Sequence, residues 1–127
     1  PGVGAHGRGR GATPGGGPGS SGRVRAAALP VLAGPLWLGD NGSIMKQVHA
    51  RLYGGSHLLN DAGQYLYYGR VAGCFITGNE DGIKHCAMNV LYTLQHICYT
   101  ILPQADTRGI GQAGPGQDYA APGSVGH

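Results

Sequence analysis

The sequence is poor in cysteine, large aromatic residues and charge. It has three cysteines, one tryptophan and one phenylalanine among 127 residues, and only 12% of its residues are charged. An odd number of cysteines without a secretory leader argues against a disulfide scaffold and favours reduced thiols in the cytoplasm. No apolar run approaches the roughly 20 residues that cross a bilayer, so we expect no membrane association.

Metal-ligating patterns are also scarce. The nearest candidates are the pairs His85–Cys86 and His96–Cys98, and no Cys-x-x-Cys pair occurs. Structural metal sites usually need several ligands at such compact spacings. We therefore predict no metal site, and we interpret Cys74 and Cys86 as small buried hydrophobic residues.

Glycine, in contrast, is abundant. There are 26 glycines and 8 prolines, and they concentrate at the two ends of the chain. Residues 1–25 contain too little apolar surface to offset the entropy of ordering, so we predict that they are disordered. Their four arginines lack interleaved aromatic residues, which makes nucleic-acid binding a poor interpretation. Residues 107–127 form a second glycine-rich tail, and residues 26–106 are left as a single foldable domain.

The centre of this domain is residues 69–97. Val71–Ile76 is an uninterrupted apolar run of strand length, typical of a parallel strand that is covered on both faces. Residues 77–82, Thr-Gly-Asn-Glu-Asp-Gly, interrupt it as a turn-rich loop. From Ile83 to Ile97 the apolar residues then recur at the spacing of three and four that indicates one face of a helix.

The flanking segments continue the same alternation. Leu29–Ala33 is a candidate strand, Pro35–Ser43 is a loop, and the next segment has the apolar spacing of a helix that ends at Gly54 and Gly55. Tyr99–Ile101 is a short strand that we expect Pro103 to stop. The fold class is therefore α/β: a partial parallel sheet of about three strands with two right-handed crossover helices and disordered ends.

Three segments carry a resemblance to a known family. They are Leu32–Ser43 with its Pro-Leu-Trp-Leu-Gly loop, Tyr68–Tyr92 with its Thr-Gly-Asn-Glu-Asp-Gly loop, and Tyr99–Asp106. Together they are similar to the flavodoxin-like NAD(P)H-dependent oxidoreductases, which include NADPH-dependent FMN reductases and flavodoxin-type quinone reductases. This resemblance implies a flavodoxin sheet, an FMN cofactor, NAD(P)H as electron donor and a quinone or other small molecule as electron acceptor. Since such proteins are often dimers or tetramers, it also allows a homo-oligomer.

The resemblance further implies that the loops after two strands flank the isoalloxazine ring of FMN. The implied cofactor-binding residues are Pro35, Leu36, Trp37, Leu38, Gly39, Asp40, Asn41, Thr77, Gly78, Asn79, Glu80, Asp81 and Gly82. Residue chemistry agrees, because glycines allow close backbone approach and an indole ring offers a stacking surface. Ligands of open α/β sheets also bind beyond the carboxyl ends of the strands.

Alternatives stay open at several of these residues. Trp37 could be a packing residue, Glu80 and Asp81 could serve only the dipole of the following helix, and His85 could be an exposed first-turn histidine. No catalytic side chain is predicted, because hydride passes directly between nicotinamide and flavin. The family's first strand and phosphate loop have no counterpart before Leu29, and Gly15–Ser21 lacks the flanking strand and helix. The alternative function is therefore a truncated or degenerate remnant that does not bind FMN.

Overall fold

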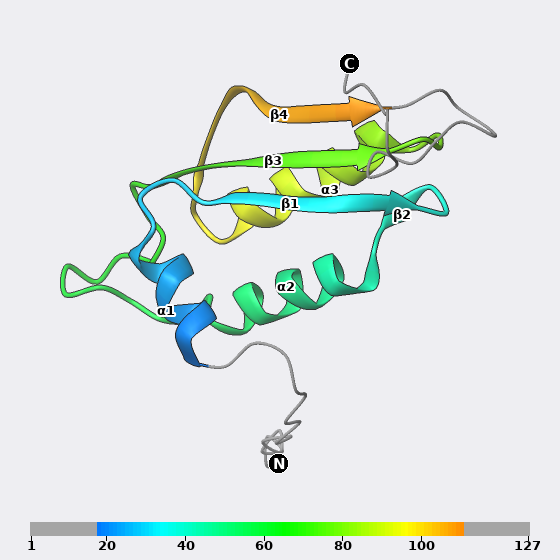
Figure 1. Ribbon diagram of the computed structural model, residues 1–127. Coiled ribbons are helices and arrows are strands. Elements are labelled where there is room, and N and C mark those ends of the chain that lie inside the picture. The colour runs from blue at the N-terminus through cyan, green and yellow to red at the C-terminus, as the bar shows by residue number, and fades with distance from the viewer. Residues whose placement is uncertain (1–17, 111–127) are drawn as a thin grey trace, which may run out of the picture.

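The computed structural model describes residues 18–110, which form a sheet with helices packed against it (Figure 1). The sheet has the strand order β2-β1-β3-β4. Strands β1 (Val31–Trp37), β3 (Val71–Gly78) and β4 (Thr100–Ile110) are mutually parallel, and β2 (Asp40–Asn41) is a short antiparallel addition to β1. The predicted α/β class, with three parallel strands joined by two helical crossovers, is confirmed.

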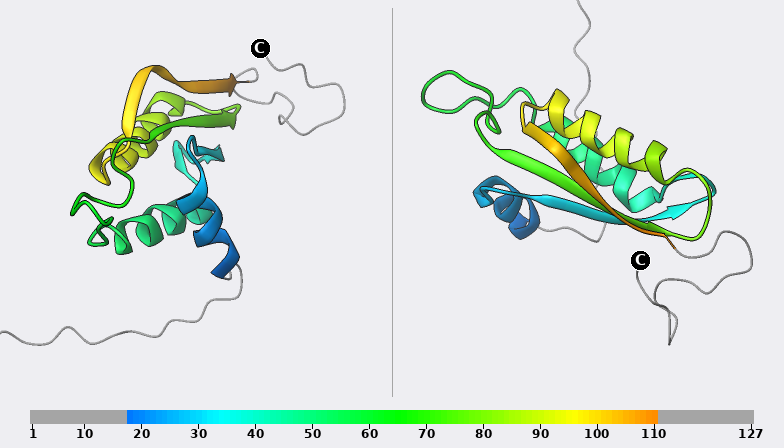
Figure 2. Two further views of the ribbon diagram at one scale, coloured as in Figure 1. Left: turned by 90° about the vertical axis from the view of Figure 1, so that its left-hand side faces the viewer. Right: turned by 90° about the horizontal axis from the view of Figure 1, so that it is seen from above.

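Strand β3 is the centre of the sheet. Its alternate residues Ala72, Cys74 and Ile76 are buried against the helices, with exposed fractions of 2% or less. Both edges of β3 are hydrogen-bonded, to β1 and to β4. The apolar run predicted a strand covered on both faces, but both crossover helices lie on the same face of the sheet (Figure 2). The core as a whole consists of Leu36, Met45, Leu52, Tyr67, Ala72, Cys74, Ile76, Ile83, Cys86, Ala87, Val90, Leu94, Ile97 and Tyr99.

Helices α2 (Ser43–Gly54) and α3 (Ile83–His96) form a single layer. Figure 2 shows both on the same side of the sheet. This follows from the topology, because two crossovers of one hand that advance in the same direction place their helices on one face. The predicted apolar face of α3 is buried at Ile83, Ala87, Val90 and Leu94. None of the helices between residues 18 and 110 is long and apolar enough to cross a membrane.

Strand β4 differs from the prediction that Pro103 stops it. Pairing with β3 shifts between Ala72↔Ile101 and Cys74↔Asp106, so four residues of β4 lie opposite Gly73 alone. The chain bulges out around Pro103, which has no N–H to donate, and pairing then resumes as far as Ile110. The prediction was wrong because the hydrogen bonds available from β3 beyond the bulge outweigh the local break.

The amino-terminal end also differs from its prediction. Residues 18–25, which were expected to be disordered together with residues 1–17, belong to helix α1 (Pro18–Ala26). Its Val24 packs against the core, and Arg70 Nη1 donates a hydrogen bond to the carbonyl of Arg25. At the other end, residues 107–110 were predicted to begin the glycine-rich tail 107–127 but belong to β4. Residues 1–17 and 111–127 lie outside the described residues.

Candidate functional site

The two loops that the sequence singles out meet at one edge of the sheet. Because β1 and β3 are parallel neighbours, the segments that follow them leave from the same edge. Gly39, in the first loop, touches the second loop: a Cβ at Gly82 would lie 2.5 Å from the Gly39 carbonyl oxygen. Trp37 and Asn79 therefore lie at the same edge, as the sequence interpretation requires.

The first loop is a tight hairpin between β1 and β2. Trp37 pairs with Asp40, and the two residues between them, Leu38 and Gly39, have φ angles of 52° and 74°. Positive φ at both central positions defines the type I′ turn that suits two-residue hairpins. The segment predicted as the loop Pro35–Ser43 thus contains the end of β1 and the whole of β2, and the turn between them leaves Leu38 93% exposed at its tip.

Trp37 is 61% exposed, although one side of its ring packs against the chain near Gly42. A Cβ on Gly42 would lie 3.3 Å from the indole ring and 3.7 Å from Pro35 Cγ. The indole therefore rests over the segment that leads from β2 into α2, with much of its surface open to solvent. This arrangement combines the two sequence interpretations, packing residue and exposed stacking surface.

Of the second predicted loop, Thr77–Gly82, the first two residues still belong to β3, and residues 79–82 turn from β3 into α3. Gly78 lies against the first strand, since a Cβ there would be 2.8 Å from Leu36 Cβ. Gly82 has a φ of 111° and its N–H donates to Asp81 Oδ1 at 2.8 Å. Glu80 and Asp81 are exposed, while Thr77, Gly78 and Asn79 are half-buried. Only glycine combines this backbone conformation with so close a contact to the first loop.

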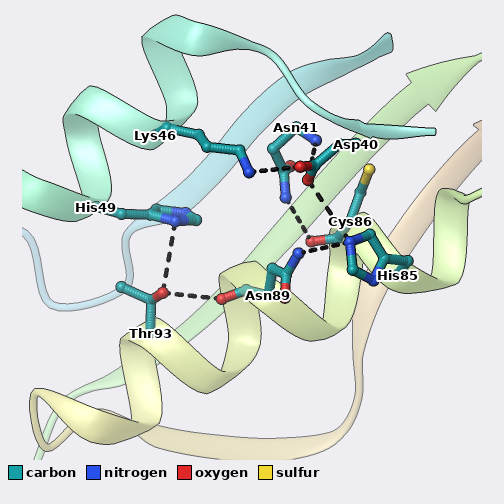
Figure 3. A network of polar contacts seen from close by, with 8 residues as sticks. All are labelled: Asp40, Asn41, Lys46, His49, His85, Cys86, Asn89 and Thr93. Carbon is teal, nitrogen blue, oxygen red and sulfur yellow. Dashed lines mark hydrogen bonds and ion pairs between the residues drawn. The ribbon is translucent and has the colours of Figure 1, made fainter. Parts of the chain in front are cut away.

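A polar cluster underlies the hairpin, where β2 and the two helices meet (Figure 3). Lys46 Nζ donates to Asp40 Oδ2 at 2.5 Å, and the Asn41 N–H donates to Asp40 Oδ1 at 2.7 Å. These two hydrogen bonds lower the pKa of the Asp40 carboxyl below its ordinary value. Asp40 thus remains a carboxylate, held between helix α2 and the strand that carries it.

Asn41 connects the hairpin to α3. Its side chain is buried, and Nδ2 donates to the Cys86 carbonyl at 3.0 Å, while Oδ1 has no hydrogen-bond partner among the described residues. His85 stands beside this contact, with Nε2 3.7 Å from Asp40 Oδ1 and 3.1 Å from Asn89 Nδ2. A predicted cofactor-binding residue therefore has a structural role in fixing the loop to the helix.

His49, Asn89 and Thr93 complete the cluster and were missed by sequence reasoning. Thr93 Oγ1 donates to the Asn89 carbonyl at 2.8 Å and lies 3.5 Å from His49 Nδ1 (Figure 3). Burial, together with the positive charge of Lys46, lowers the pKa of His49 and keeps its ring neutral. Their signal in the sequence was weak, because contact between α2 and α3 depends on how the two helices pack.

The cysteines behave as small hydrophobic residues. Cys74 and Cys86 are buried, as predicted, and Cys98 is half-buried at a φ of 77°. Burial raises the pKa of the Cys74 thiol to about 11. Within residues 18–110, no three His, Cys, Asp or Glu side chains gather in a way that could hold a metal ion.

Two of the proteins that the chain is similar to are flavin-related enzymes. The chain is 34% identical over 97 residues to 8-demethyl-8-aminoriboflavin-5'-phosphate synthase of Streptomyces davaonensis, a match that covers 76% of this chain and 38% of that protein. The crystal structure of RosB with a bound intermediate, 8-demethyl-8-formylriboflavin-5'-phosphate, has a TM-score of 0.75 at 33% identity and is matched over 81% of this chain and 41% of that one. The chain thus has a flavodoxin-like, flavin-associated α/β fold.

The chain is also similar to part of a protein that is not named for a flavin. Over 104 residues the chain is 66% identical to the divalent metal cation transporter MntH of Mycobacterium bovis, a match that covers 82% of this chain and 15% of that protein. No family model matches the sequence. The chain spans less than half the length of each of these relatives.

Proposed function

We propose that this chain is the flavin-ring-binding portion of an FMN-dependent NAD(P)H oxidoreductase that passes electrons to a quinone or another small acceptor. The observation that carries the proposal is the convergence of the 35–41 and 77–82 loops at the carboxyl edge of β1 and β3. This edge is where open α/β sheets bind their ligands. The same proposal places the protein in the cytoplasm, where its nicotinamide donor is found, and allows it to self-associate.

The residues at this edge suit a flat, largely apolar ring. Trp37 and Leu38 expose apolar surface on one loop, and the glycines allow the two loops to pack closely against each other beside it. Bound FMN would supply the hydride-accepting ring, and the chain's own residues would bind it, orient it and limit its contact with water. Asp40 and Asn41, tied to Lys46 and Cys86, hold the first loop in place for that task.

The relatives support the flavin part of the proposal. Two of them are named for derivatives of riboflavin 5'-phosphate, the chemical class to which FMN belongs. The nicotinamide donor and the quinone acceptor rest on the family resemblance of the sequence. They are tested by following NADH or NADPH oxidation with FMN and a soluble quinone present.

Flavin binding is tested by titrating FMN with the full 127-residue chain. We expect quenching of flavin fluorescence at tens of micromolar protein or below, because stacking against an indole ring quenches flavin emission. Gly82→Ala should weaken binding by at least roughly tenfold, about 1.4 kcal/mol, since its Cβ would push the two loops apart. The matched control is Gly63→Ala: Gly63 has a φ of 73° but nothing within 4 Å of the added Cβ. The control should keep the affinity, and equal loss in both variants would contradict the proposed site.

A second candidate is a remnant of the same fold that does not bind FMN. The observation in its favour is that Gly39 and Gly82 pack directly against each other, so the two loops meet without a gap between these residues. It predicts no fluorescence quenching and no change in the melting temperature when FMN is added. A saturable rise in melting temperature with FMN, lost in Gly82→Ala, would eliminate it.

A further inference from the structure

A pocket of about 340 Å³ lies between the carboxyl-terminal halves of α2 and α3. Six of the residues that line it belong to those halves: His49, Ala50, Tyr53, Tyr92, Thr93 and His96. Both helices begin at the edge of the sheet that carries the candidate flavin loops, and α3 is roughly 20 Å long. The pocket therefore lies toward the opposite end of the helix layer, and it contains none of the residues proposed to bind FMN.

Three aromatic rings from the two helices stand beside one another at this pocket. The centroid of the His96 ring lies 5.7 Å from that of Tyr53 and 6.1 Å from that of Tyr92, with the ring planes tilted by 35° and 31°. Tyr53 is 58% exposed and Tyr92 is 68% exposed. Rings at such separations attract one another, and the exposed tyrosines leave surface on which a further flat ring can pack.

The lining of the pocket offers no partner for a charged ligand. None of the residues from 18 to 110 that line it is an aspartate, glutamate, lysine or arginine. Burial and the positive charge of Lys46 lower the pKa of His49, so its ring is neutral. A carboxylate or an ammonium group would lose hydration here without gaining an opposite charge. The pocket thus favours an uncharged occupant.

The polar side of the pocket offers a hydrogen-bond acceptor. Thr93 Oγ1 donates its one proton to the Asn89 carbonyl, so His49 Nδ1 is the donor in the 3.5 Å contact between the two side chains (Figure 3). A neutral imidazole that carries its proton on Nδ1 has an acceptor at Nε2. His49 Nε2 is buried, and it has no hydrogen-bond partner among the described residues. Buried polar atoms normally have one.

We propose that this pocket binds a small, uncharged aromatic compound of one or two rings that carries an N–H or O–H group. The ring would pack against Tyr53 and Tyr92, and the N–H or O–H group would donate to His49 Nε2. That contact requires the half-buried imidazole to turn about its Cβ–Cγ bond, because Nε2 is covered. The volume of the pocket, about 340 Å³, is near the lower end of the roughly 300–1,000 Å³ of ligand pockets, which limits the compound to this size.

The test is a titration of the full 127-residue chain, labelled with ¹⁵N, with indole in the absence of FMN. We expect saturable shifts of the backbone amide signals of residues 49–53 and 92–97, with a Kd of about 1 mM or lower. N-Methylindole keeps the rings but lacks the N–H, and it should bind roughly fivefold more weakly. Indole-3-acetate keeps the N–H but adds a carboxylate, and it should also bind more weakly than indole.

Variants of exposed residues separate binding from folding. Ala50→Leu places a larger side chain in the pocket and should abolish the shifts, whereas Gln47→Leu adds the same side chain one turn earlier on α2, outside the pocket, and should bind indole normally. Tyr92→Ala should weaken binding roughly three- to tenfold. Its control is Met88→Ala, because Met88 is also 68% exposed on α3 but does not line the pocket. We expect the melting temperatures of these variants to confirm that each is folded.

Three results would overturn the proposal. The first is the absence of saturable shifts with indole while the chain is folded. The second is equal binding of indole by Ala50→Leu and Gln47→Leu, or of indole and N-methylindole by the original chain. The third is a set of shifts confined to residues 37–41 and 77–82, which would place indole at the candidate flavin site instead. Since no flavin is present, failure of the proposed function would leave the expected result unchanged.

Discussion

Leu38 has a left-handed backbone conformation, which glycine and asparagine adopt more readily than leucine. It sits at φ 52° at the tip of the β1–β2 hairpin and is 93% exposed, so its side chain contributes little packing. A left-handed conformation costs a non-glycine residue roughly 1–2 kcal/mol, whereas Asn-Gly is the preferred pair for this turn. An exposed leucine retained in a strained position is consistent with a binding role for the side chain.

Leu38→Asn should therefore stabilise the chain by about 1 kcal/mol and weaken FMN binding at the same time. The stability is measured by urea unfolding and the affinity by the fluorescence titration. Gly39→Ala is the control in the opposite direction: at φ 74° it should destabilise the same turn. A Leu38→Asn variant that is more stable and binds FMN unchanged would show that Leu38 has no part in the site.

Cys74 makes stability depend on alkaline pH. The folded chain raises the thiol pKa from 9.0 to about 11, so the folded state holds this proton more tightly than the unfolded chain does. The resulting stabilisation is present below pH 9 and is lost as the pH rises toward 11. Tyr99, whose pKa burial raises from 10.0 to about 12, adds to the loss above pH 10.

We expect the urea midpoint to fall between pH 8.5 and pH 10.5, and to fall less steeply in Cys74→Ala. Cys98→Ser, at a half-buried cysteine, should keep the slope of the original chain. An unchanged slope in Cys74→Ala would show that another group dominates the alkaline transition.

At the scale of elements, the bulge in β4 depends on a single glycine of its neighbour. A Cβ on Gly73 would lie 2.6 Å from the Ala105 carbonyl oxygen, a backbone atom that cannot move without disturbing the strand. Gly34, also in a strand, would place its Cβ 2.7 Å from Met45 Cε, the flexible end of a side chain. The two glycines look alike in the sequence but differ in what surrounds them.

Gly73→Ala should consequently cost roughly 1–3 kcal/mol of stability, the usual range for overpacking, whereas Gly34→Ala should be tolerated because Met45 can change rotamer. Thermal unfolding of both variants makes the comparison. Equal melting temperatures would mean that β4 relaxes around the new methyl group and that the bulge is not fixed by Gly73.

The elements themselves were largely predictable, and the exceptions have physical reasons. Local signals predicted β3 and α3: an apolar run in the strand, and apolar residues three and four apart in the helix. The structure buries the residues that carry these signals, among them Ile83, Ala87, Val90 and Leu94. Pro103 was misjudged because its effect on pairing depends on β3, which lies some thirty residues away in the chain. Helix α1 was missed because its sequence has almost no apolar periodicity, and only Val24 packs against the core.

At the scale of the whole molecule, the two crossover helices α2 and α3 pack on one face of the sheet. The candidate flavin loops lie at one end of that two-layer unit (Figure 2). The flavin titration tests whether that end of the unit binds a ligand.

The sequence by itself determined the order of the three parallel strands and the two crossover helices, the burial of Cys74 and Cys86, and the position of the two loops at the candidate site. These are properties of local composition and spacing, which fix how a segment folds and which face it buries. Only the tertiary structure decided three contacts. Gly39 lies against Gly82, the Asn41 side chain donates a hydrogen bond to the Cys86 carbonyl, and His49 belongs to the polar cluster. Such contacts join residues that are more than forty positions apart, and their distances depend on how strands pair and helices pack.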